Sequence, residues 1–437
     1  MKSSGKNRIA VVDACRTPFI RSGTDFYNQM AWELGRYAVK GLIARTGVDP
    51  SVIDYVVMGT VMADISTTNV AREIMLGAGL PGSIPAHTCT AACVSSNIAV
   101  TSACEMIISG QADAVIAGGT ESFSDPDIKI SRRYRRFILD LTMYKKPKTL
   151  AGKLRLLKGM KLTDFFIPET PAIAEYSTGL TMGENADRLA RRLGITREEQ
   201  DSYACRSHRR AIEAAKKGLM KNEIVPVVVP GSGRAVTVDN GPREDASMEK
   251  LSKGRPVFER RYGSVTAGNS SFLSDGASAV LVMKESRAKQ LGLKPLAYIH
   301  SYAQAGSDPW DELLLGPAFA TALALKRCGL KLSDIKVFEI HEAFAAQILA
   351  NIRYMESDKW GRESLGLKGR MGSFNEDLFN TRGGSLSLGH PFGATGGRLI
   401  ASCCSRLKDE GKRFGLVAGC GAGAIGNAII LENAGLR

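Results

Sequence analysis

Residues 47–59 read GVDPSVIDYVVMG, and residues 329–341 read GLKLSDIKVFEIH, so the two segments can be laid over each other. Residues 114–119, AVIAGG, can likewise be laid over residues 415–420, GLVAGC. Both matches are short, but they occur in the same order in the two parts of the chain. A repeat of this kind predicts a duplicated α/β unit, and therefore a fold of two related halves.

Short apolar runs and longer helical patterns alternate along the chain. The helical patterns cover residues 95–109 and 398–410. The apolar runs, which are typical of strands buried on both faces, are residues 9–12, 56–58, 114–117, 337–340 and 416–418. This alternation predicts an α/β architecture.

The alternation breaks in the middle of the chain. A basic stretch comes first, a charged helical run from Met182 to Gly218 follows, and a connection rich in Pro and Gly ends the break. We interpret this part as a loop domain inserted into the N-terminal half. The predicted organisation is an N-terminal half over residues 1–128, completed by residues 263–293, an inserted loop domain over residues 129–262, and a C-terminal half over residues 294–437.

The composition is that of a soluble globular protein. The chain has 437 residues, 44% of them hydrophobic and 23% charged, which suits two or three domains or subdomains. The first residues, Met1 to Arg8, are polar and contain no signal peptide, so we expect a cytoplasmic protein. Its nine cysteines include no Cys-x-x-Cys pair, which favours reduced thiols and argues against a metal site.

One segment holds most of the positive charge. Between residues 129 and 161, twelve Lys and Arg stand against one acid, Asp140, and account for +11 of the net charge of +14. Apolar residues at helical spacing, such as Leu150 and Leu154, make the segment basic and amphipathic. It is therefore a solvated face, a docking site for a partner protein or a contact with an anionic membrane surface. No nucleic-acid-binding motif accompanies the charge, so we expect no nucleic-acid partner.

A cysteine follows a predicted strand in residues 87–97, HTCTAACVSSN. Cys93 falls near the first turn of the next helix, where the helix dipole and a nearby histidine would lower its pKa from the usual value of about 8.5. It is either a nucleophile or a buried filler. Cys89 and Cys104 suit the core.

Two glycine-rich turns carry a histidine and a second cysteine. Residues 389–397 read GHPFGATGG and contain His390, and residues 419–423 read GCGAG and contain Cys420. We expect the glycines to bring the backbone close to a ligand. His341 is at a strand end like Cys420, where ligands of α/β sheets bind, although a lone histidine there also suits a helix cap. His87, His208 and His300 have no such setting, and we interpret them as structural.

These residues belong to a series of motifs that covers nearly the whole chain. The motifs are RTPF at 16–19, CVS at 93–95, TMG at 181–183, TAGN at 266–269, DGA at 275–277, HEAF at 341–344 and GHP at 389–391. In this order and spacing the chain resembles the thiolases, and among them the long, insertion-bearing β components of fatty-acid oxidation complexes. The resemblance implies a thiolase-like fold, with two duplicated α/β halves and an inserted loop domain.

The resemblance also implies an activity. The chain would be an acetyl-CoA C-acyltransferase (3-ketoacyl-CoA thiolase) of fatty-acid β-oxidation. Such an enzyme cleaves 3-ketoacyl-CoA with CoA to acetyl-CoA and a shortened acyl-CoA, with CoA as a substrate and no bound cofactor. The alternative within the family is a short-chain acetyl-CoA C-acetyltransferase. A ketoacyl synthase also has a duplicated fold with Cys and His, but Cys420 and the CoA-lining motifs speak against it.

The family's roles are carried over residue by residue. Cys93 would be the acylated nucleophile, His390 would take its proton, and Cys420 would be the acid and base at the α-carbon. His341 stands where many thiolases have Asn, and would hold a water or donate directly to an oxyanion site shared with His390. The N–H groups of Cys93 and Ala422 would form a second oxyanion site. The positions that would line the CoA and acyl channel are Met182, Arg243, Ser271 and Phe344.

The sequence departs from the family pattern in two motifs. Ala422 stands where glycine is usual, and Ile425 and Asn427 are also unusual there. Val94-Ser95-Ser96 replaces the commoner Ala-Ser-Gly, which we expect to alter the acyl pocket.

The resemblance implies partners as well. These would be a second copy in a homodimer or dimer of dimers, and a hydratase/dehydrogenase α subunit or an anionic membrane surface bound through residues 129–161.

Overall fold

The computed structural model describes residues 8–62, 64–167 and 173–436. The expectation about a signal peptide concerns residues 1–7, which lie outside the described residues. Within the described residues, ten strands form one sheet, in the order β10-β11-β12-β9-β1-β8-β5-β3-β4, with β2 beside β8. The strands are β1 (Ile9–Arg16), β2 (Ile20–Arg21), β3 (Tyr55–Gly59), β4 (Ala86–Cys89), β5 (Ala114–Glu121), β8 (Ser274–Lys284), β9 (Ala297–Gly306), β10 (Ile335–Ile340), β11 (Phe414–Gly421) and β12 (Ile425–Asn433). A separate small ribbon joins β6 (Val227–Val228) and β7 (Ala235–Val236).

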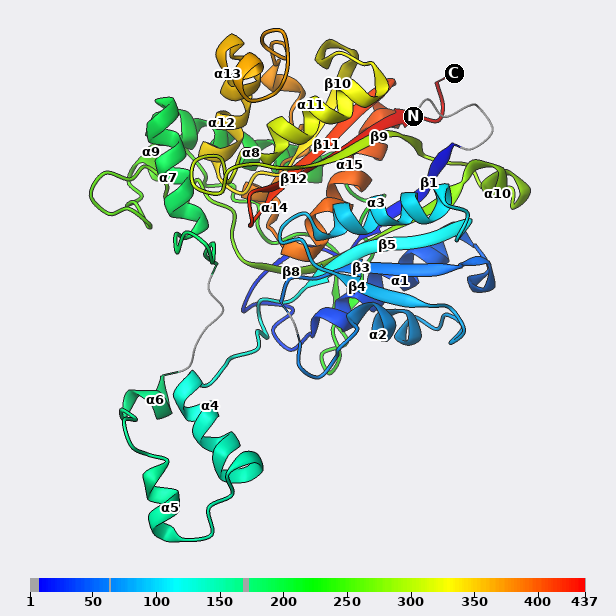
Figure 1. The fold of residues 1–437 in the computed structure, drawn as a ribbon. Helices are drawn as coiled ribbons and strands as arrows, with labels where there is room; N and C mark the ends of the chain where they lie inside the picture. The colour runs from blue at the N-terminus through cyan, green and yellow to red at the C-terminus, as the bar shows by residue number, and fades with distance from the viewer. Residues whose placement is uncertain (1–7, 63, 168–172, 437) are drawn as a thin grey trace.

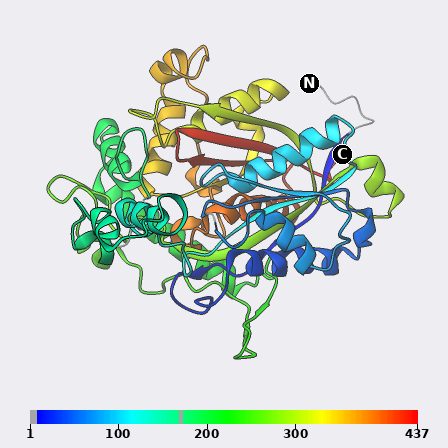
Figure 2. The ribbon, with the colours of Figure 1, turned by 60° about the horizontal axis from the view of Figure 1, so that its bottom comes forward.

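The two ends of this sheet repeat one pattern. In the N-terminal half, β3 is parallel to β5, and β5 is antiparallel to β8. In the C-terminal half, β10 is parallel to β11, and β11 is antiparallel to β12. The halves join where β1 pairs with β9, and β12 pairs with the other edge of β9, so the end of β12 lies close to the start of β1 (Figure 2). Arg8, directly before β1, forms an ion pair there with Glu432 of β12. The predicted duplication is confirmed.

The strand register corrects one of the two alignments. Tyr55 pairs with Val115 in the first half, whereas Val337 pairs with Gly415 in the second. The segments 114–119 and 415–420 are therefore out of step by one residue, and Ala114 corresponds to Phe414. The similar letters AGG and AGC suggested the wrong match, because pairing across the sheet, and not residue likeness, sets the register.

The helices form three layers around the sheet (Figure 1). Those of the two halves are α1 (Ala31–Thr46), α2 (Val70–Gly77), α3 (Ser95–Ile108), α10 (Glu285–Gln290), α11 (Gly316–Cys328), α12 (Ala345–Glu356), α13 (Asp358–Glu363), α14 (Ser385–Leu388) and α15 (Thr395–Asp409). The helices α3 and α15 lie in the middle, in one apolar core with strands of both halves. The helices α1 and α2 cover the other face of the N-terminal strands, and α11 and α12 cover that of the C-terminal strands.

Strand residues face these layers alternately, as a pleated strand requires. In β3, Val57 faces the middle layer, whereas Val56 and Met58 face α1 and α2. Burial on both faces explains the continuous apolar runs that identified the strands. The same burial explains why α3, which is packed between two layers, consists largely of small and apolar residues.

Both copies of the repeat start with a glycine for one reason. Gly47 ends α1 and Gly329 ends α11, each in the left-handed conformation, with φ of 63° and 72°. Glycine adopts this conformation without the steric cost that a Cβ brings.

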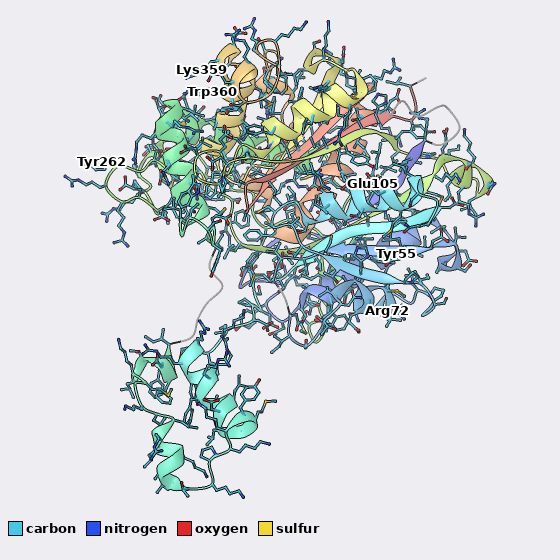
Figure 3. The ribbon with its side chains drawn as sticks, viewed as in Figure 1. Tyr55, Arg72, Glu105, Tyr262, Lys359 and Trp360 are labelled. Atoms are coloured by element: carbon cyan, nitrogen blue, oxygen red, sulfur yellow. The ribbon has the colours of Figure 1, made fainter. Side chains whose placement is uncertain are left out.

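The middle of the chain has two unlike parts. The first is a hairpin of α4 (Arg132–Leu139), α5 (Leu150–Arg155) and α6 (Thr163–Phe166), and it stands away from the body (Figures 1 and 3). None of the residues of these three helices is buried. The second part contains α7 (Met182–Leu193), α8 (Arg197–Lys216) and α9 (Met248–Ser252), of which α7 and α8 pack on α12 of the C-terminal half.

The single helical run expected from Met182 to Gly218 is wrong in one respect. Gly194 ends α7 with φ of 63°, and Thr196 caps the start of α8 by accepting a bond from the N–H of Glu199. These are ordinary stop and start signals, and they divide the run into two helices.

Two further observations concern cysteines and membranes. All nine cysteines lie in the described residues and are free thiols. No described helix combines the length and apolarity needed to cross a membrane.

Candidate active site

Cys93 is at the tip of a strained turn between β4 and α3. Ala92, directly before it, has φ of 47°, which costs a residue with a Cβ about 1–2 kcal/mol. Ser95 stabilises the turn, because its hydroxyl accepts from the N–H of Ala91 at 2.9 Å and donates to the carbonyl of Ala92 at 2.6 Å. Strain held in place by the surrounding structure is typical of functional positions.

The Cys93 thiol is more basic than the sequence led us to expect. Burial raises its pKa far above the usual range, and the neighbouring Cys420 and Glu121 raise it further. Cys93 lies two residues before the start of α3 at Ser95, so the lowering expected from the helix dipole opposes this effect of burial and stays a prediction. The residue as a whole is only partly buried, and it is the loss of solvent around the sulfur that favours the protonated thiol in the resting enzyme.

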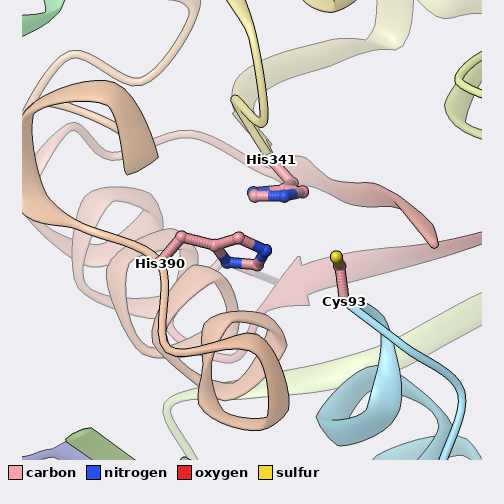
Figure 4. A group of neighbouring side chains, drawn as sticks. All are labelled: Cys93, His341 and His390. Atoms are coloured by element: carbon pink, nitrogen blue, oxygen red, sulfur yellow. The ribbon is translucent and has the colours of Figure 1, made fainter. Parts of the chain in front are cut away.

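Two histidines face Cys93 from the C-terminal half (Figure 4). His341 follows β10, where its N–H donates to the carbonyl of Ala418 at 2.8 Å, and His390 follows α14, where its N–H donates to Ser274 Oγ at 3.0 Å. Their ring centres are 4.0 Å apart. The Cys93 sulfur and one nitrogen of each ring all lie within 4.8 Å of one another. The fold thus assembles three residues that are far apart in the sequence.

Both imidazoles are uncharged at neutral pH. Burial lowers the pKa of His341 to about 3, and Arg398 contributes to the lowering. Burial, His341 and Arg398 together hold the pKa of His390 well below its usual value. Each ring therefore has one N–H donor and one nitrogen lone pair.

Each histidine has a hydroxyl partner on Nδ1 and a free Nε2. The Nδ1 of His341 lies 2.9 Å from Ser385 Oγ, which also accepts from Nη2 of Arg398 at 2.9 Å. The Nδ1 of His390 lies 2.6 Å from Thr395 Oγ1, which is also 3.0 Å from the carbonyl of Pro391. Within the part of the chain that the structure describes, both Nε2 atoms are buried and have no hydrogen-bond partner. Such atoms are available to a bound substrate.

Cys420 lies beside the nucleophile turn, near the end of β11. A Cβ added to Gly419 would lie 3.0 Å from Val94 Cγ1, and one added to Gly421 would lie 3.0 Å from the carbonyl of Ala91. Cys420 itself is 1% exposed, and burial raises the pKa of its thiol to about 12. The structure thus brings the two predicted cysteines together.

The predicted CoA contacts are only partly gathered here. Met182 and Phe344 share an apolar cluster with Cys420, and Ser271 adjoins it through a bond from its N–H to the carbonyl of Ala343, at 2.9 Å. Arg243 is placed differently, because its guanidinium pairs with Asp245 and its N–H donates to His208.

Sequence reasoning missed Phe258 in the same cluster. Its ring meets that of Phe344 edge to face, with centres 6.0 Å apart, and lies where a side chain on Gly183 would be. The glycine of the TMG motif was the available signal, because it leaves room for an aromatic ring.

Ala422 is in the turn between β11 and β12 and is partly exposed. Gly423 and Ala424 follow with φ of 86° and 55°. Alanine retains the backbone N–H that glycine would supply, so the role of Ala422 as an oxyanion donor stays a prediction.

The glycines of residues 389–397 serve a different purpose from the one expected. A Cβ on Gly393 would lie 2.4 Å from the carbonyl of Thr120, and one on Gly396 would lie 1.9 Å from Asn97 Oδ1. A Cβ on Gly397 would lie 2.2 Å from Ser278 Oγ. These glycines allow one part of the chain to approach another, and the expectation that they admit a ligand is wrong for them.

A buried carboxylate that the sequence did not reveal holds this loop. Glu121, at the end of β5, accepts from the N–H groups of Val61, Met62 and Gly393 at 2.9–3.1 Å and from the hydroxyl of Thr60 at 3.2 Å. Burial raises its pKa to about 7, against the influence of these donors. Glu121 thus joins the loop after β3 to the loop after His390.

Val94-Ser95-Ser96, expected to alter the acyl pocket, has a structural role at its two serines. Both are fully buried, and Ser96 accepts from the N–H of Gly397 at 3.0 Å. Ser96 thus fixes α3 against α15, whereas Ser95 stabilises the turn that carries Cys93. The effect on the acyl pocket stays a prediction.

A thiol and two imidazoles are also zinc ligands. Arg398, which is fully buried and lowers the pKa of both rings, opposes a second cation there. That the site holds no metal stays a prediction.

Comparisons with known proteins agree with this geometry. Residues 9–286 match the family described as thiolase, N-terminal domain, and residues 293–433 match thiolase, C-terminal domain. The mitochondrial trifunctional enzyme subunit beta of Bos taurus is 50% identical over 424 residues, which are 97% of this chain and 88% of that protein. A 3-ketoacyl-CoA thiolase of Yersinia enterocolitica is 43% identical over 426 residues, 98% of this chain and 97% of that one. The crystal structure of human mitochondrial 3-ketoacyl-CoA thiolase in complex with CoA is similar with a TM-score of 0.83 and 30% identity, covering 98% of each chain.

Proposed function

The chain belongs to the thiolase family, and on that premise we propose that it is a 3-ketoacyl-CoA thiolase of fatty-acid β-oxidation. The observation that carries the proposal is the assembly of Cys93, two neutral imidazoles and Cys420 at one place. A nucleophile, a base and a second acid are the groups that thiolytic cleavage requires. CoA is a substrate in this reaction, and no bound cofactor takes part.

In the first step, Cys93 attacks the 3-keto carbon of the substrate. Its proton passes to His390 as the sulfur–carbon bond forms, and the carbonyl electron pair moves to the oxygen. The raised thiol pKa means that proton transfer accompanies attack, because the resting pair is a thiol and a neutral imidazole. Burial strengthens the hydrogen bonds to the new oxyanion.

In the second step, the bond between C2 and C3 breaks. The acyl group stays on Cys93, and the released electron pair forms the enolate of acetyl-CoA. Cys420 donates its proton to C2, and the proton held by His390 restores the Cys420 thiol. A thiol held near pKa 12 suits the reversible proton exchange at a weakly acidic carbon.

In the third step, CoA enters and its sulfur attacks the thioester. The acyl group passes to the CoA sulfur, and the bond between the acyl carbon and the Cys93 sulfur breaks. The Cys93 thiolate so released takes up the thiol proton of CoA through His390. The double displacement predicts ping-pong kinetics.

The direct test is CoA-dependent cleavage of 3-ketoacyl-CoA substrates of increasing chain length, with Cys93→Ala as the control. Cleavage of long substrates supports the proposal. A second candidate, a short-chain acetyl-CoA C-acetyltransferase, has support from the crystal structure of the Bacillus anthracis acetyl-CoA acetyltransferase, with a TM-score of 0.82 and 31% identity. Cleavage of acetoacetyl-CoA alone would favour that candidate, and no CoA-dependent cleavage at all would exclude both.

For the hairpin of α4–α6 we propose a docking role, to an α subunit with hydratase and dehydrogenase activity or to an anionic membrane. Its charge supports both, as do Met143, Leu150 and Leu154, which are more than half exposed. A relative named as a subunit of a trifunctional enzyme supports the first.

Co-sedimentation with vesicles of phosphatidylcholine and phosphatidylserine, at low and high salt, separates the two partners. Salt-sensitive binding to the anionic vesicles supports the membrane, and its absence excludes it. Replacement of hairpin lysines by alanine would abolish this binding, whereas the matched change elsewhere would leave it intact. The hairpin set is Lys145, Lys146 and Lys148, and the control set is Lys216, Lys253 and Lys289.

We also propose a homo-oligomer, a dimer or a dimer of dimers, in the cytoplasm. Among the described strands, β4 pairs with β3 alone, so its outer edge offers free backbone groups to a second copy. Light scattering of the purified protein would test the assembly, and a monomer at micromolar concentration would exclude it. The cytoplasm is the expectation from the sequence, whereas the mammalian relatives are named mitochondrial, so cell fractionation decides the location.

A further inference from the structure

Two neutral imidazoles lie side by side, although the reaction requires a different protonation state of the site-facing nitrogen in each. A base must offer an unprotonated nitrogen to the Cys93 thiol, whereas an oxyanion needs an N–H donor. Both Nε2 atoms face the site without a partner among the described residues. The hydrogen-bond partner of each Nδ1 therefore determines which ring is the base and which is the oxyanion donor.

At His341, the surroundings make Nδ1 an acceptor. Among the described residues, Ser385 Oγ has two hydrogen-bond partners, His341 Nδ1 and Arg398 Nη2, each at 2.9 Å. A guanidinium can only donate, so Ser385 accepts from Arg398 and its own hydrogen is left for His341. The proton of the neutral ring is then on Nε2, which faces the site as a donor.

At His390, the surroundings favour the opposite arrangement. Thr395 Oγ1 lies 2.6 Å from Nδ1 and can donate its hydrogen to the carbonyl of Pro391, at 3.0 Å. Its lone pairs then accept from an Nδ1–H of His390. The Nε2 of His390 is left with a lone pair, which is the form that can take the Cys93 proton.

We propose that Ser385 and Thr395 hold the two histidines in opposite tautomers, with Arg398 setting the direction of the Ser385 hydroxyl. His341 then presents an Nε2–H to the substrate oxygen, and His390 presents an Nε2 lone pair to the thiol. Ser385, Thr395 and Arg398 are positioning residues, because they act through the rings. The proposal rests on the thiolase function proposed above and assigns direct donation to His341.

The first turn of α15 carries two of the three positioning residues. Thr395 and Arg398 are three residues apart at the start of α15, and therefore on the same side of it. Arg398 is fully buried, and its Nε and Nη1 make no hydrogen bond within the described residues. Its Nη1 lies 3.6 Å from a carboxylate oxygen of Glu339, which also forms an ion pair with Arg406.

The consequence for the first step is a division of work. As Cys93 attacks, its proton moves to His390 Nε2, and the substrate oxygen gains the electron pair of the carbonyl bond. That oxygen already accepts from His341 Nε2–H, so the positive hydrogen is in place before the charge develops. Pre-oriented donors of this kind are worth about 10²–10³ in rate.

The first experiment is a double-mutant cycle on cleavage of a 3-ketoacyl-CoA. Ser385→Ala should lower kcat by about 10-fold or more with little change in KM. The ring of His341 stays in place, but no hydroxyl then fixes its proton on Nε2. Ser385→Thr keeps a hydroxyl and should restore most of the rate. In a His341→Asn background the side-chain amide donates without Ser385, so Ser385→Ala should have no further effect.

The matched control is Ser387→Ala. Ser387 is on the same short helix and is also fully buried, but its hydroxyl bonds Ser207 and the carbonyl of Gly384. A general disturbance of α14 would slow both serine variants alike, and equal losses would overturn the proposal.

The second experiment observes the tautomers directly. With only five histidines, protein labelled with 15N at histidine gives few signals, and His341→Asn assigns one ring. At neutral pH the wild type should show His341 protonated on Nε2 and His390 protonated on Nδ1. The signal of His341 should change in Ser385→Ala and stay unchanged in Ser387→Ala.

The two proposals fail in distinguishable ways. A wild-type protein without CoA-dependent cleavage contradicts the thiolase function, whereas the 15N signals still test the tautomers. An active wild type with His341 protonated on Nδ1, or with Ser385→Ala fully active, contradicts the tautomer assignment alone.

Discussion

The two halves of the molecule contact each other through equivalent loops, but one junction is filled and the other is open. The helix α3 begins at Ser95 and α15 begins at Thr395, so Gly393 occupies in the C-terminal half the place that Cys93 has in the N-terminal half. Each loop lies over the strand ends of the other half. The duplicated fold thus offers two similar places for a site.

At the filled junction, the Gly393 loop lies against β3 and β5. A Cβ on Gly119 would be 1.9 Å from the carbonyl of Gly393, and Glu121 occupies the remaining space with its bonds to both loops. At the open junction, Gly419 is the counterpart of Gly119, and a Cβ there would be 3.0 Å from a side chain, Val94. The counterpart of Glu121 is Gly421.

The difference shows how one scaffold yields one site. A carboxylate fills the junction at the N-terminal strands and makes it structural. Glycine leaves the junction at the C-terminal strands free for Cys93, Cys420 and the two imidazoles. Chemistry at one junction and rigidity at the other are therefore linked, since the loop with His390 is held by Glu121 through Gly393.

The largest expected effect is at the open junction. Cys93→Ala should lower kcat by about 10⁴-fold or more and abolish the acyl-enzyme, because it removes the sulfur that faces both imidazoles and takes the acyl group. Intact mass spectrometry after mixing with 3-ketoacyl-CoA measures the acyl-enzyme. An unchanged unfolding curve is the control, and an acylated variant would mean that the nucleophile is elsewhere.

Cys420→Ala should stop the proton transfer at C2 and leave the acylation of Cys93 intact. We expect cleavage to fall by about 10²–10⁴-fold, because the acid and base at C2 is lost. Acylation of Cys93 by a simple acyl-CoA should continue, while exchange of the α-protons of acetyl-CoA with deuterium should stop. Loss of both reactions together would show that Cys420 is structural.

At the filled junction, a change should act on stability. Glu121→Gln replaces an oxygen that accepts two bonds by an NH₂ group that faces donors, and should lower the free energy of unfolding by about 1–3 kcal/mol. Urea unfolding measures this, and Glu249→Gln, whose side chain is exposed, is the control. A stable variant with lost activity would mean that Glu121 takes part in the chemistry and that the junctions do not differ as described.

The smallest effect is in the pH profile of acylation. Since burial holds the pKa of His390 well below 6.5, the base stays unprotonated as the pH falls through 6. The rate of single-turnover acylation at pH 5.5 should thus be close to that at pH 7.5, whereas a base with an ordinary pKa of about 6.5 would lose about tenfold. A loss of rate centred near pH 6.5 would indicate that His390 is in contact with solvent, contrary to the burial described.

Sequence patterns predicted the repeat, the strands β1, β3, β4, β5, β10 and β11, and the residues of the open junction, because these depend on local runs and short motifs. The strands β8, β9 and β12 were not predicted. The patterns also did not predict Glu121, Ser385 or Arg398, whose partners come from distant segments. The effect of burial on the pKa of Cys93 was not predicted either, because the helix dipole is a local feature whereas burial is a product of the whole fold. The same limit explains the one-residue error in aligning β5 with β11.

The protonated state of the Cys93 thiol has a consequence for reagents that modify cysteine. Oxidants and simple alkylating agents react with thiolates, and burial, which raises the pKa of the Cys93 thiol, lowers the share of thiolate that they meet in the resting enzyme. A compound with a carbonyl oxygen positioned for the two imidazoles would transfer the proton and activate the sulfur as it binds. Selective covalent inhibitors of this protein should therefore be designed around the oxygen that the histidines bind, and general electrophilicity should contribute little.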